Sequence, residues 1–225
     1  MVCYCPERKI IYIHVAKTGG ITIETILSKR YGFKHFTFSD SEDPYPFLRE
    51  PRGKLGTYKY ILKYSNEAKI YDLNSFRKFA FVRDPYTRGI SAIRYLHKNS
   101  IRNSLYRDDE KKLPKKGYFP MSIDSFYYTA LNNDYYYMHF CLSQKKSLED
   151  LDGNIDFIIG RFENLMPDLK RILFTEFGLE ESNIENLHIN QSDQSILQLN
   201  PDKVKELIKQ IHLEDFEFFG YPISK

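Results

Sequence analysis

The first residues with clear chemical capacity are a lysine and a glycine pair, Lys17-Thr18-Gly19-Gly20. Glycine lets a backbone turn sharply and come close to a ligand. Lysine adds a full positive charge, and the backbone N–H groups that open a following helix attract an anion. In the common nucleoside-triphosphate loop, by contrast, four residues separate a glycine from Gly-Lys-Ser/Thr. The stretch therefore predicts a phosphate-binding turn of another kind, although taken alone it fits an ordinary strand-to-helix connection equally well.

A second candidate site combines an arginine with a serine on the next predicted helix, Arg83 and Ser91. Arg83 follows the apolar run Phe79–Val82, and Pro85 suits the first turn of a helix. Ser91 then lies two helical turns beyond Arg83, close enough to meet the same ligand. An arginine at a strand end and a hydroxyl on the following helix can bind one phosphate together. This second stretch makes the phosphate-binding interpretation of the first the stronger one.

Both candidate sites lie where an apolar strand passes into a helix. Ile10–Val15 is rich in β-branched residues, as buried strands of parallel sheets are. After the first turn, Ile23, Ile26 and Leu27 recur at helical spacing. A chain of 225 residues is long enough for one such domain, and no repeat or linker divides it. The sequence predicts a single α/β domain over residues 1–225, with a central, mainly parallel sheet flanked by helices.

Cap residues and composition place several further elements. Ser122 predicts a helix start, and Asn200-Pro201 predicts the start of a last helix through His212. Phe33–Phe38 reads as a second strand. Lys98–Pro120 is polar and basic and is predicted to be a loop.

Composition excludes several classes of function. Hydrophobic residues make up 42% and charged residues 28% of the chain, as in ordinary globular proteins. The formal charge of +3 is too small to imply nucleic-acid binding, but it suits an anionic cofactor met by a local basic site. Cys3-x-Cys5 lacks the spacing and partners of a zinc site, so no metal is expected. No apolar run of membrane-spanning length occurs either, and we expect no membrane span.

The two candidate sites resemble a known family. HVAKTGGITIE and FVRDPYTRGISA are similar to the two cofactor-binding stretches of the family 2 (carbohydrate-type) sulfotransferases. The resemblance covers nearly the whole chain, because four further stretches match that family in order. These are HFCLSQ at His139–Gln144, DFIIGRFENL at Asp156–Leu165, HINQS at His188–Ser192 and the closing DFEFFGY.

The resemblance implies a P-loop-like sulfotransferase fold and a donor, 3′-phosphoadenosine 5′-phosphosulfate (PAPS), that leaves as 3′-phosphoadenosine 5′-phosphate (PAP). It implies that Arg83 and Ser91 hold the 3′-phosphate. Ile21 stands where the family usually has threonine. Because Thr18 and Thr22 still supply hydroxyls, we expect weaker rather than absent binding. The residues implied to hold the 5′-phosphosulfate form one contiguous turn: Lys17, Thr18, Gly19, Gly20, Ile21 and Thr22.

The resemblance also suggests the catalytic residues. The family places its general base on a histidine or glutamate after the second strand, and the segment around His35 resembles the K-H-x-T of its short bacterial members. We expect His35 to lie at the end of its strand, beside the turn, and to take the acceptor's proton. A lone histidine after a strand is more often structural, and that alternative stays open. Lys17 would neutralise charge on the leaving group.

The resulting hypothesis is an enzyme, a PAPS-dependent sulfotransferase that acts on a hydroxyl of a carbohydrate or small metabolite. One alternative is a nucleotide-binding module of the same fold without transfer activity. Another is a P-loop-type kinase, although the loop that it requires is missing. The eukaryotic members are typically anchored in the Golgi by an N-terminal span, and no such span is seen here, so we expect a cytoplasmic enzyme. The acceptor and the oligomeric state are left open.

Overall fold

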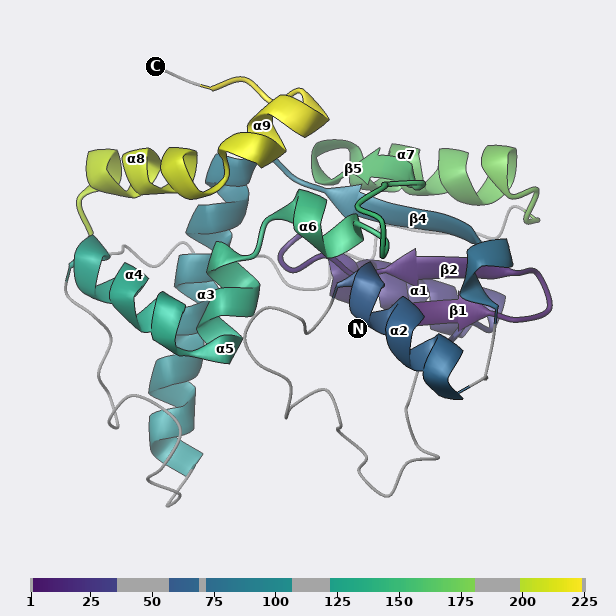
Figure 1. Cartoon of the computed structure of the whole chain (residues 1–225), viewed down its shortest axis with the longest axis horizontal. Coiled ribbons are helices and arrows are strands. Elements are labelled where there is room, and N and C mark those ends of the chain that lie inside the picture. The colour runs from purple at the N-terminus through teal and green to yellow at the C-terminus, as the bar shows by residue number, and fades with distance from the viewer. Residues whose placement is uncertain (1, 36–56, 69–71, 107–121, 181–198, 224–225) are drawn as a thin grey trace. The chain divides into compact units, whose positions relative to one another are not determined.

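The computed structural model of the chain describes residues 2–35, 57–68, 72–106, 122–180 and 199–223 (Figure 1). The chain forms two compact units. Unit 1 consists of Met1–Arg83 and Gln144–Asn190. Unit 2 consists of Asp84–Ser143 and Gln191–Lys225. Among the described residues, no helix is both long and apolar enough to span a bilayer.

Unit 1 contains the sheet. Its strands are β1 (Val2–Cys5), β2 (Ile10–Ile13), β3 (Lys34–His35), β4 (Arg77–Val82) and β5 (Ile158–Arg161). Its α-helices are α1 (Gly20–Tyr31), α2 (Tyr58–Ala68), α6 (Gln144–Leu148) and α7 (Leu165–Lys170). The 3₁₀ turns η2 (Leu73–Ser75) and η4 (Phe162–Asn164) and the π-helix η5 (Arg171–Glu176) complete its described elements.

The five described strands form one sheet in the order β3-β1-β2-β4-β5. β2, β4 and β5 are parallel neighbours, whereas β1 runs antiparallel to both β2 and β3. β3 therefore has the direction of β2, and β1 alone is reversed among the described strands. This arrangement confirms the predicted α/β class and mainly parallel sheet. The reversed strand β1 was not predicted, because a four-residue run before the Pro6–Lys9 turn carries little strand signal.

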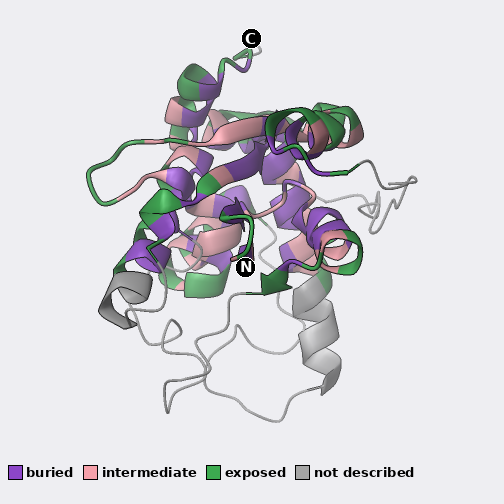
Figure 2. Cartoon of the chain, turned by 90° about the vertical axis from the view of Figure 1, so that its right-hand side faces the viewer, coloured by how far each residue is buried: buried purple, intermediate pink, exposed green. Residues whose placement is uncertain are grey.

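The sheet is buried on both faces. On β2, Tyr12 faces α1 and packs with Phe79 of β4, with ring centroids 5.1 Å apart. Ile11 and Ile13 point to the opposite face by strand alternation and are also fully buried. Figure 1 shows α1 behind the strands and α2 in front of them, and Figure 2 shows the buried residues gathered between these layers. A strand covered on both faces reads as a continuous apolar run, which is why β2 and β4 were predictable.

Unit 2 is helical in its described residues. Its helices are α3 (Pro85–Tyr106), α4 (Ile123–Asn132), α5 (Asp134–Tyr136), the π-helix η3 (Tyr137–Cys141), α8 (Pro201–Ile211) and α9 (Leu213–Phe219). The predicted loop Lys98–Pro120 is wrong for its first part, because α3 continues to Tyr106. That part contains neither proline nor glycine, so its polar composition does not end the helix. Residues 107–121 lie outside the described chain.

The helix starts of unit 2 follow the predicted caps. Ser122 accepts a hydrogen bond from the N–H of Ser125 at 3.2 Å, and Asn200 caps α8. Asp84 caps α3, because its Oδ1 accepts the N–H of Thr87 at 2.8 Å. The aspartate after β4 thus serves as the N-cap of α3.

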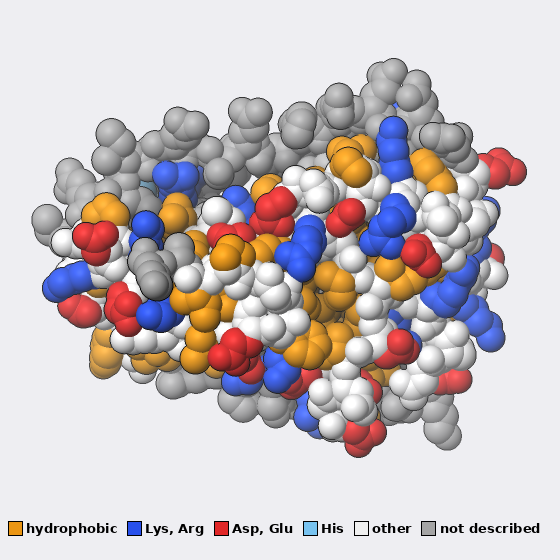
Figure 3. Space-filling view, turned by 90° about the horizontal axis from the view of Figure 1, so that it is seen from above, with side chains coloured by type: hydrophobic (Ala, Val, Ile, Leu, Met, Phe, Trp, Pro, Cys, Tyr) orange, Lys and Arg blue, Asp and Glu red, His pale blue; other side chains and the backbone are white. Residues whose placement is uncertain are grey.

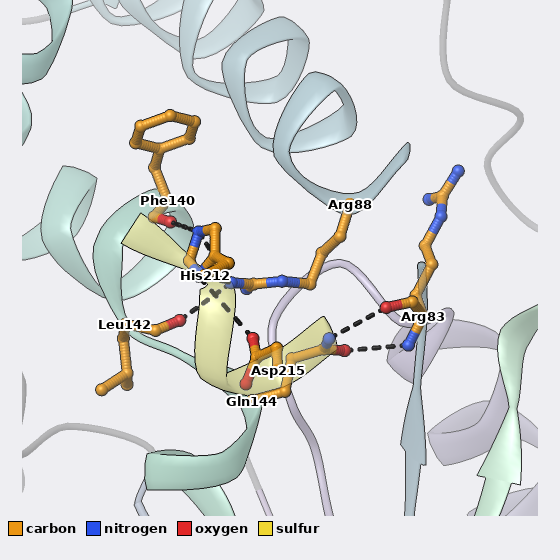
Figure 4. A network of polar contacts seen from close by, with 7 residues as sticks. All are labelled: Arg83, Arg88, Phe140, Leu142, Gln144, His212 and Asp215. Carbon is orange, nitrogen blue, oxygen red and sulfur yellow. Dashed lines mark hydrogen bonds and ion pairs between the residues drawn. The ribbon is translucent and has the colours of Figure 1, made fainter. Parts of the chain in front are cut away.

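A buried polar network ties α3 to the C-terminal helices within unit 2 (Figure 4). The fully buried Arg88 donates to the carbonyl of Leu142 at 2.9 Å, and its Nη2 lies 3.3 Å from Nε2 of His212. His212 donates from Nε2 to the carbonyl of Phe140 at 2.8 Å. Burial lowers the pKa of Arg88, and the charge of Asp215, which is also buried, opposes that shift. These contacts link η3 to α3 and to the junction between α8 and α9.

We expect the free energy of unfolding to decrease as the pH falls below about 6.5, the ordinary pKa of histidine. Burial first, and then the charge of Arg88, lower the pKa of His212 well below that value. The unfolded chain therefore binds a proton there that the folded chain does not, which favours unfolding by up to about 1.4 kcal/mol per pH unit. Denaturant titrations between about pH 7.5 and 5.5 measure this slope, ahead of most carboxylate titration. The variant H212Q should show a shallower slope, and an unchanged slope would contradict the assignment.

Candidate active site

The turn between β2 and α1 has the backbone of an anion-binding loop. Lys17 and Gly19 both have positive φ angles, 69° and 84°, so two of three consecutive residues have a left-handed backbone. The hydroxyl of Thr18 donates to the carbonyl of Val15 at 2.8 Å and stabilises the turn from inside. The carbonyl of Gly19 accepts the N–H groups of Thr22 and Ile23 at 3.0 and 3.3 Å. The N–H groups at the very start of α1 have no acceptor within the helix, as at any helix N-terminus, and can bind an anion.

Each glycine of the turn has its own structural reason. Gly19 has a left-handed backbone, and a Cβ there would lie 3.1 Å from the ring of Phe162. A Cβ at Gly20 would overlap the ring of His14. The pair is therefore needed both for the turn and for the close approach of two aromatic rings.

Lys17 lies in a partly buried, electropositive environment. Burial first, and then the nearby charge of Arg83, lower the pKa of its ammonium group to about 8. Nη1 of Arg83 also donates to the carbonyl of Lys17 at 3.4 Å. Two cationic side chains thus meet at the start of a helix, and a bound anion would relieve their repulsion.

Arg83 is held by two residues from distant parts of unit 1. Its backbone N–H donates to Oε1 of Gln144 at 2.8 Å, and its carbonyl accepts from Nε2 of the same amide at 2.9 Å (Figure 4). Gln144 is fully buried, so this paired contact fixes the end of β4. The guanidinium lies 4.1 Å from the ring centroid of Phe162, within cation–π distance. Phe162 therefore contacts both Arg83 and Gly19 of the turn.

Sequence reasoning did not identify Gln144 or Phe162 as site residues. Both lay within stretches that resembled the family, HFCLSQ and DFIIGRFENL, but nothing in those stretches indicated contacts with Arg83. The Cα register of β4 with β5 places Val82 beside Arg161, the residue before Phe162. The strand pairing is what brings the aromatic ring to the arginine.

His35 lies on the edge strand β3 and points to the α1 face of the sheet. It pairs with Cys3 of β1, which in turn pairs with Tyr12 of β2, so β1 separates His35 from the strand that carries the turn. Nδ1 of His35 lies 3.4 Å from the sulfur of Cys3. Burial chiefly raises the pKa of Cys3 to about 12, so the sulfur remains a thiol. The catalytic role of His35 stays a prediction.

The remaining predicted ligands are placed as follows. Ile21 is about half exposed at the start of α1, whereas Thr22 is buried. Ser91 is buried on α3 and belongs to unit 2, whereas Arg83 belongs to unit 1. Their joint contact with a 3′-phosphate therefore stays a prediction based on their spacing in the sequence.

Other histidines have structural partners. His139 stacks on Tyr95 with ring centroids 5.0 Å apart, and the ring of Tyr135 lies tilted beside it at 4.4 Å. Its Nδ1 donates to the carbonyl of Tyr135. The stretch His188–Ser192 lies outside the described residues. In the described part of the chain, His, Cys, Asp and Glu form no group of three that could hold a metal ion.

Comparison with known proteins identifies the family. A family model described as "Sulfotransferase family" matches residues 1–222, which include the turn, Arg83, Ser91 and His35. No curated protein and no solved structure gave a significant match. The family match extends over both units. It includes the two motif stretches that contain the candidate sites. The chain therefore belongs to the family 2 sulfotransferases.

Proposed function

We propose that this protein transfers a sulfuryl group from PAPS to a hydroxyl of a carbohydrate or small metabolite and releases PAP. The observation that carries this proposal is the turn after β2, in which Lys17 and the helix N-terminus lie next to Arg83. Basic and acidic side chains are mixed on the face shown in Figure 3.

The residues of the turn suit a phosphosulfate group. The N–H groups of Thr18 to Ile21 would hold the 5′-phosphate, with help from the hydroxyl of Thr22. The donor supplies the sulfuryl group, and the protein supplies position and charge, as in phosphoryl transfer. Lys17 would stabilise the negative charge that develops on the bridging oxygen. Burial lowers the pKa of Lys17. The negative charge that develops during transfer would oppose this effect and favour the protonated form of Lys17.

His35 would accept the proton of the attacking hydroxyl. It lies on the face of the sheet that α1 covers. We further propose that the two units act as one sulfotransferase domain, a proposal supported by the family match across both.

Substitution of Arg83 by alanine is expected to weaken PAP binding by about tenfold to a hundredfold, the usual effect of losing hydrogen bonds to a charged group. S91A should cost less, about threefold to tenfold, because a hydroxyl forms a weaker bond. Both variants should bind adenosine 5′-phosphosulfate, which lacks the 3′-phosphate, nearly as well as the wild type. Calorimetry with the two ligands measures the difference.

Lys78 provides the matched control for Arg83. It is a cation on the same strand and pairs with Asp156 at 3.0 Å. K78A should leave both affinities unchanged. Equal losses for the two ligands in R83A would contradict a 3′-phosphate role.

A transfer assay tests the function as a whole. Radiolabelled PAPS is incubated with a panel of glycans and hydroxyl-bearing metabolites, and labelled products are separated. Transfer to any acceptor supports the proposal, whereas tight PAP binding without transfer across a broad panel favours a binding module. Magnesium-dependent turnover of ATP would favour the kinase alternative.

A further inference from the structure

A buried hydrogen bond between two side chains joins the two ends of the turn that is proposed to bind the phosphosulfate. His14 follows β2 immediately before the turn, and Glu24 lies on α1 just after it. Nδ1 of His14 and Oε1 of Glu24 are 2.9 Å apart, and their side chains are only 15% and 6% exposed. Every residue implied to hold the 5′-phosphosulfate lies between these two positions.

The environment sets the protonation of the pair. Burial lowers the pKa of His14, which favours the neutral imidazole. Burial would raise the pKa of Glu24, but the hydrogen bond from His14 is the largest of the effects that oppose burial, and the pKa is lowered. A neutral imidazole next to a carboxylate must donate from Nδ1, because a carboxylate only accepts. The pair is thus a single charge-assisted hydrogen bond with a fixed ring orientation.

Packing fixes the ring of His14 against the first turn of α1. The ring stacks over Tyr12, with the two planes inclined by 18°. The ring edge formed by Cδ2, Nε2 and Cε1 occupies the space that a Cβ at Gly20 would need. The imidazole is therefore held between β2 and the residue that opens α1, next to the N–H groups expected to bind the anion.

We propose that His14 and Glu24 form a clasp that holds the amide donors of the turn in their anion-binding arrangement before any ligand is present. The role in nucleotide binding rests on the proposed function, but the clasp itself does not. Both residues are positioning residues that act through the backbone of Lys17 to Ile21. A turn ordered in advance loses less conformational freedom on binding, which raises affinity without adding a ligand contact.

Hydrogen exchange of the ligand-free protein tests the clasp directly. E24A should speed exchange of the Thr22 and Ile23 amides, which donate to the carbonyl of Gly19, by about tenfold or more, because the turn can then open locally. E24Q keeps an acceptor oxygen for Nδ1–H, and we expect exchange within about threefold of the wild type. I26V provides the matched control, since it loses one buried methylene from the same helix without touching the pair.

Calorimetry with PAP then connects the clasp to binding. E24A should bind PAP about tenfold more weakly, while E24Q and I26V stay within about threefold of the wild type. The clasp is overturned if E24A exchanges like the wild type, if I26V speeds the same amides equally, or if E24Q is as impaired as E24A. Faster exchange in E24A together with no PAP binding by the wild type would support the clasp and refute the proposed donor.

Discussion

Replacing Lys17 with alanine is expected to lower the rate of sulfuryl transfer by about 10²–10³, the usual cost of one charge-stabilising group in a transition state. Lys17 is the cation within the turn itself, and burial together with Arg83 lowers its pKa to about 8. Its loss removes charge stabilisation from the leaving group, and PAP should bind more weakly as well. Single-turnover kinetics at saturating PAPS separate the two effects.

The pH dependence of PAP binding provides an independent check of the same residue. Because the pKa of Lys17 is about 8, the free protein loses this charge above that pH, and binding an anion must take a proton back up. The affinity should therefore fall above about pH 8, by up to about tenfold per pH unit. K17A should lack this decrease, whereas K29A, at an exposed position of α1, should retain it. K17A activity within a few-fold of the wild type would contradict the role.

The turn was predictable because it is made of consecutive residues. The glycine pair, the lysine and the flanking apolar runs form one local pattern, and each glycine proved to have a steric reason. The position of Arg83, directly after a buried strand, was predictable on the same grounds. The contacts that hold Arg83 were not, because Gln144 and Phe162 come from distant parts of the chain and only tertiary structure joins them.

The elements that were missed share a weak local signal. β1 is four residues long, and its role as the neighbour of both β2 and β3 depends on sheet pairing. The C-terminal part of α3 is polar and basic, so charge alone suggested a loop where the structure has a helix. The position of His35 depends on β1, and its distance from the turn could not follow from the order of predicted strands alone.

The prediction that His35 is the general base depends most on the position of β1 between β2 and β3. H35A is expected to lower kcat by about 10²–10⁴, the usual contribution of a general base, with PAP affinity nearly unchanged. To act as a base, His35 must keep Nε2 unprotonated, so Nδ1 must carry the proton and donate it to the Cys3 sulfur at 3.4 Å. Rapid-quench kinetics with PAPS and an identified acceptor measure the change.

Cys3 and the other histidines determine how the result is interpreted. C3A removes the partner of Nδ1 but keeps the ring, so it should lower kcat less than H35A. If H35A keeps its rate while H139A or H97A loses it, the role of base belongs to that residue. If no histidine substitution lowers kcat, a carboxylate is the next candidate, such as Asp40 or Glu50, which lie outside the described residues. Each of these outcomes leaves Lys17 and the turn in place, because the acceptor's proton and the leaving group's charge are separate requirements of the same transfer.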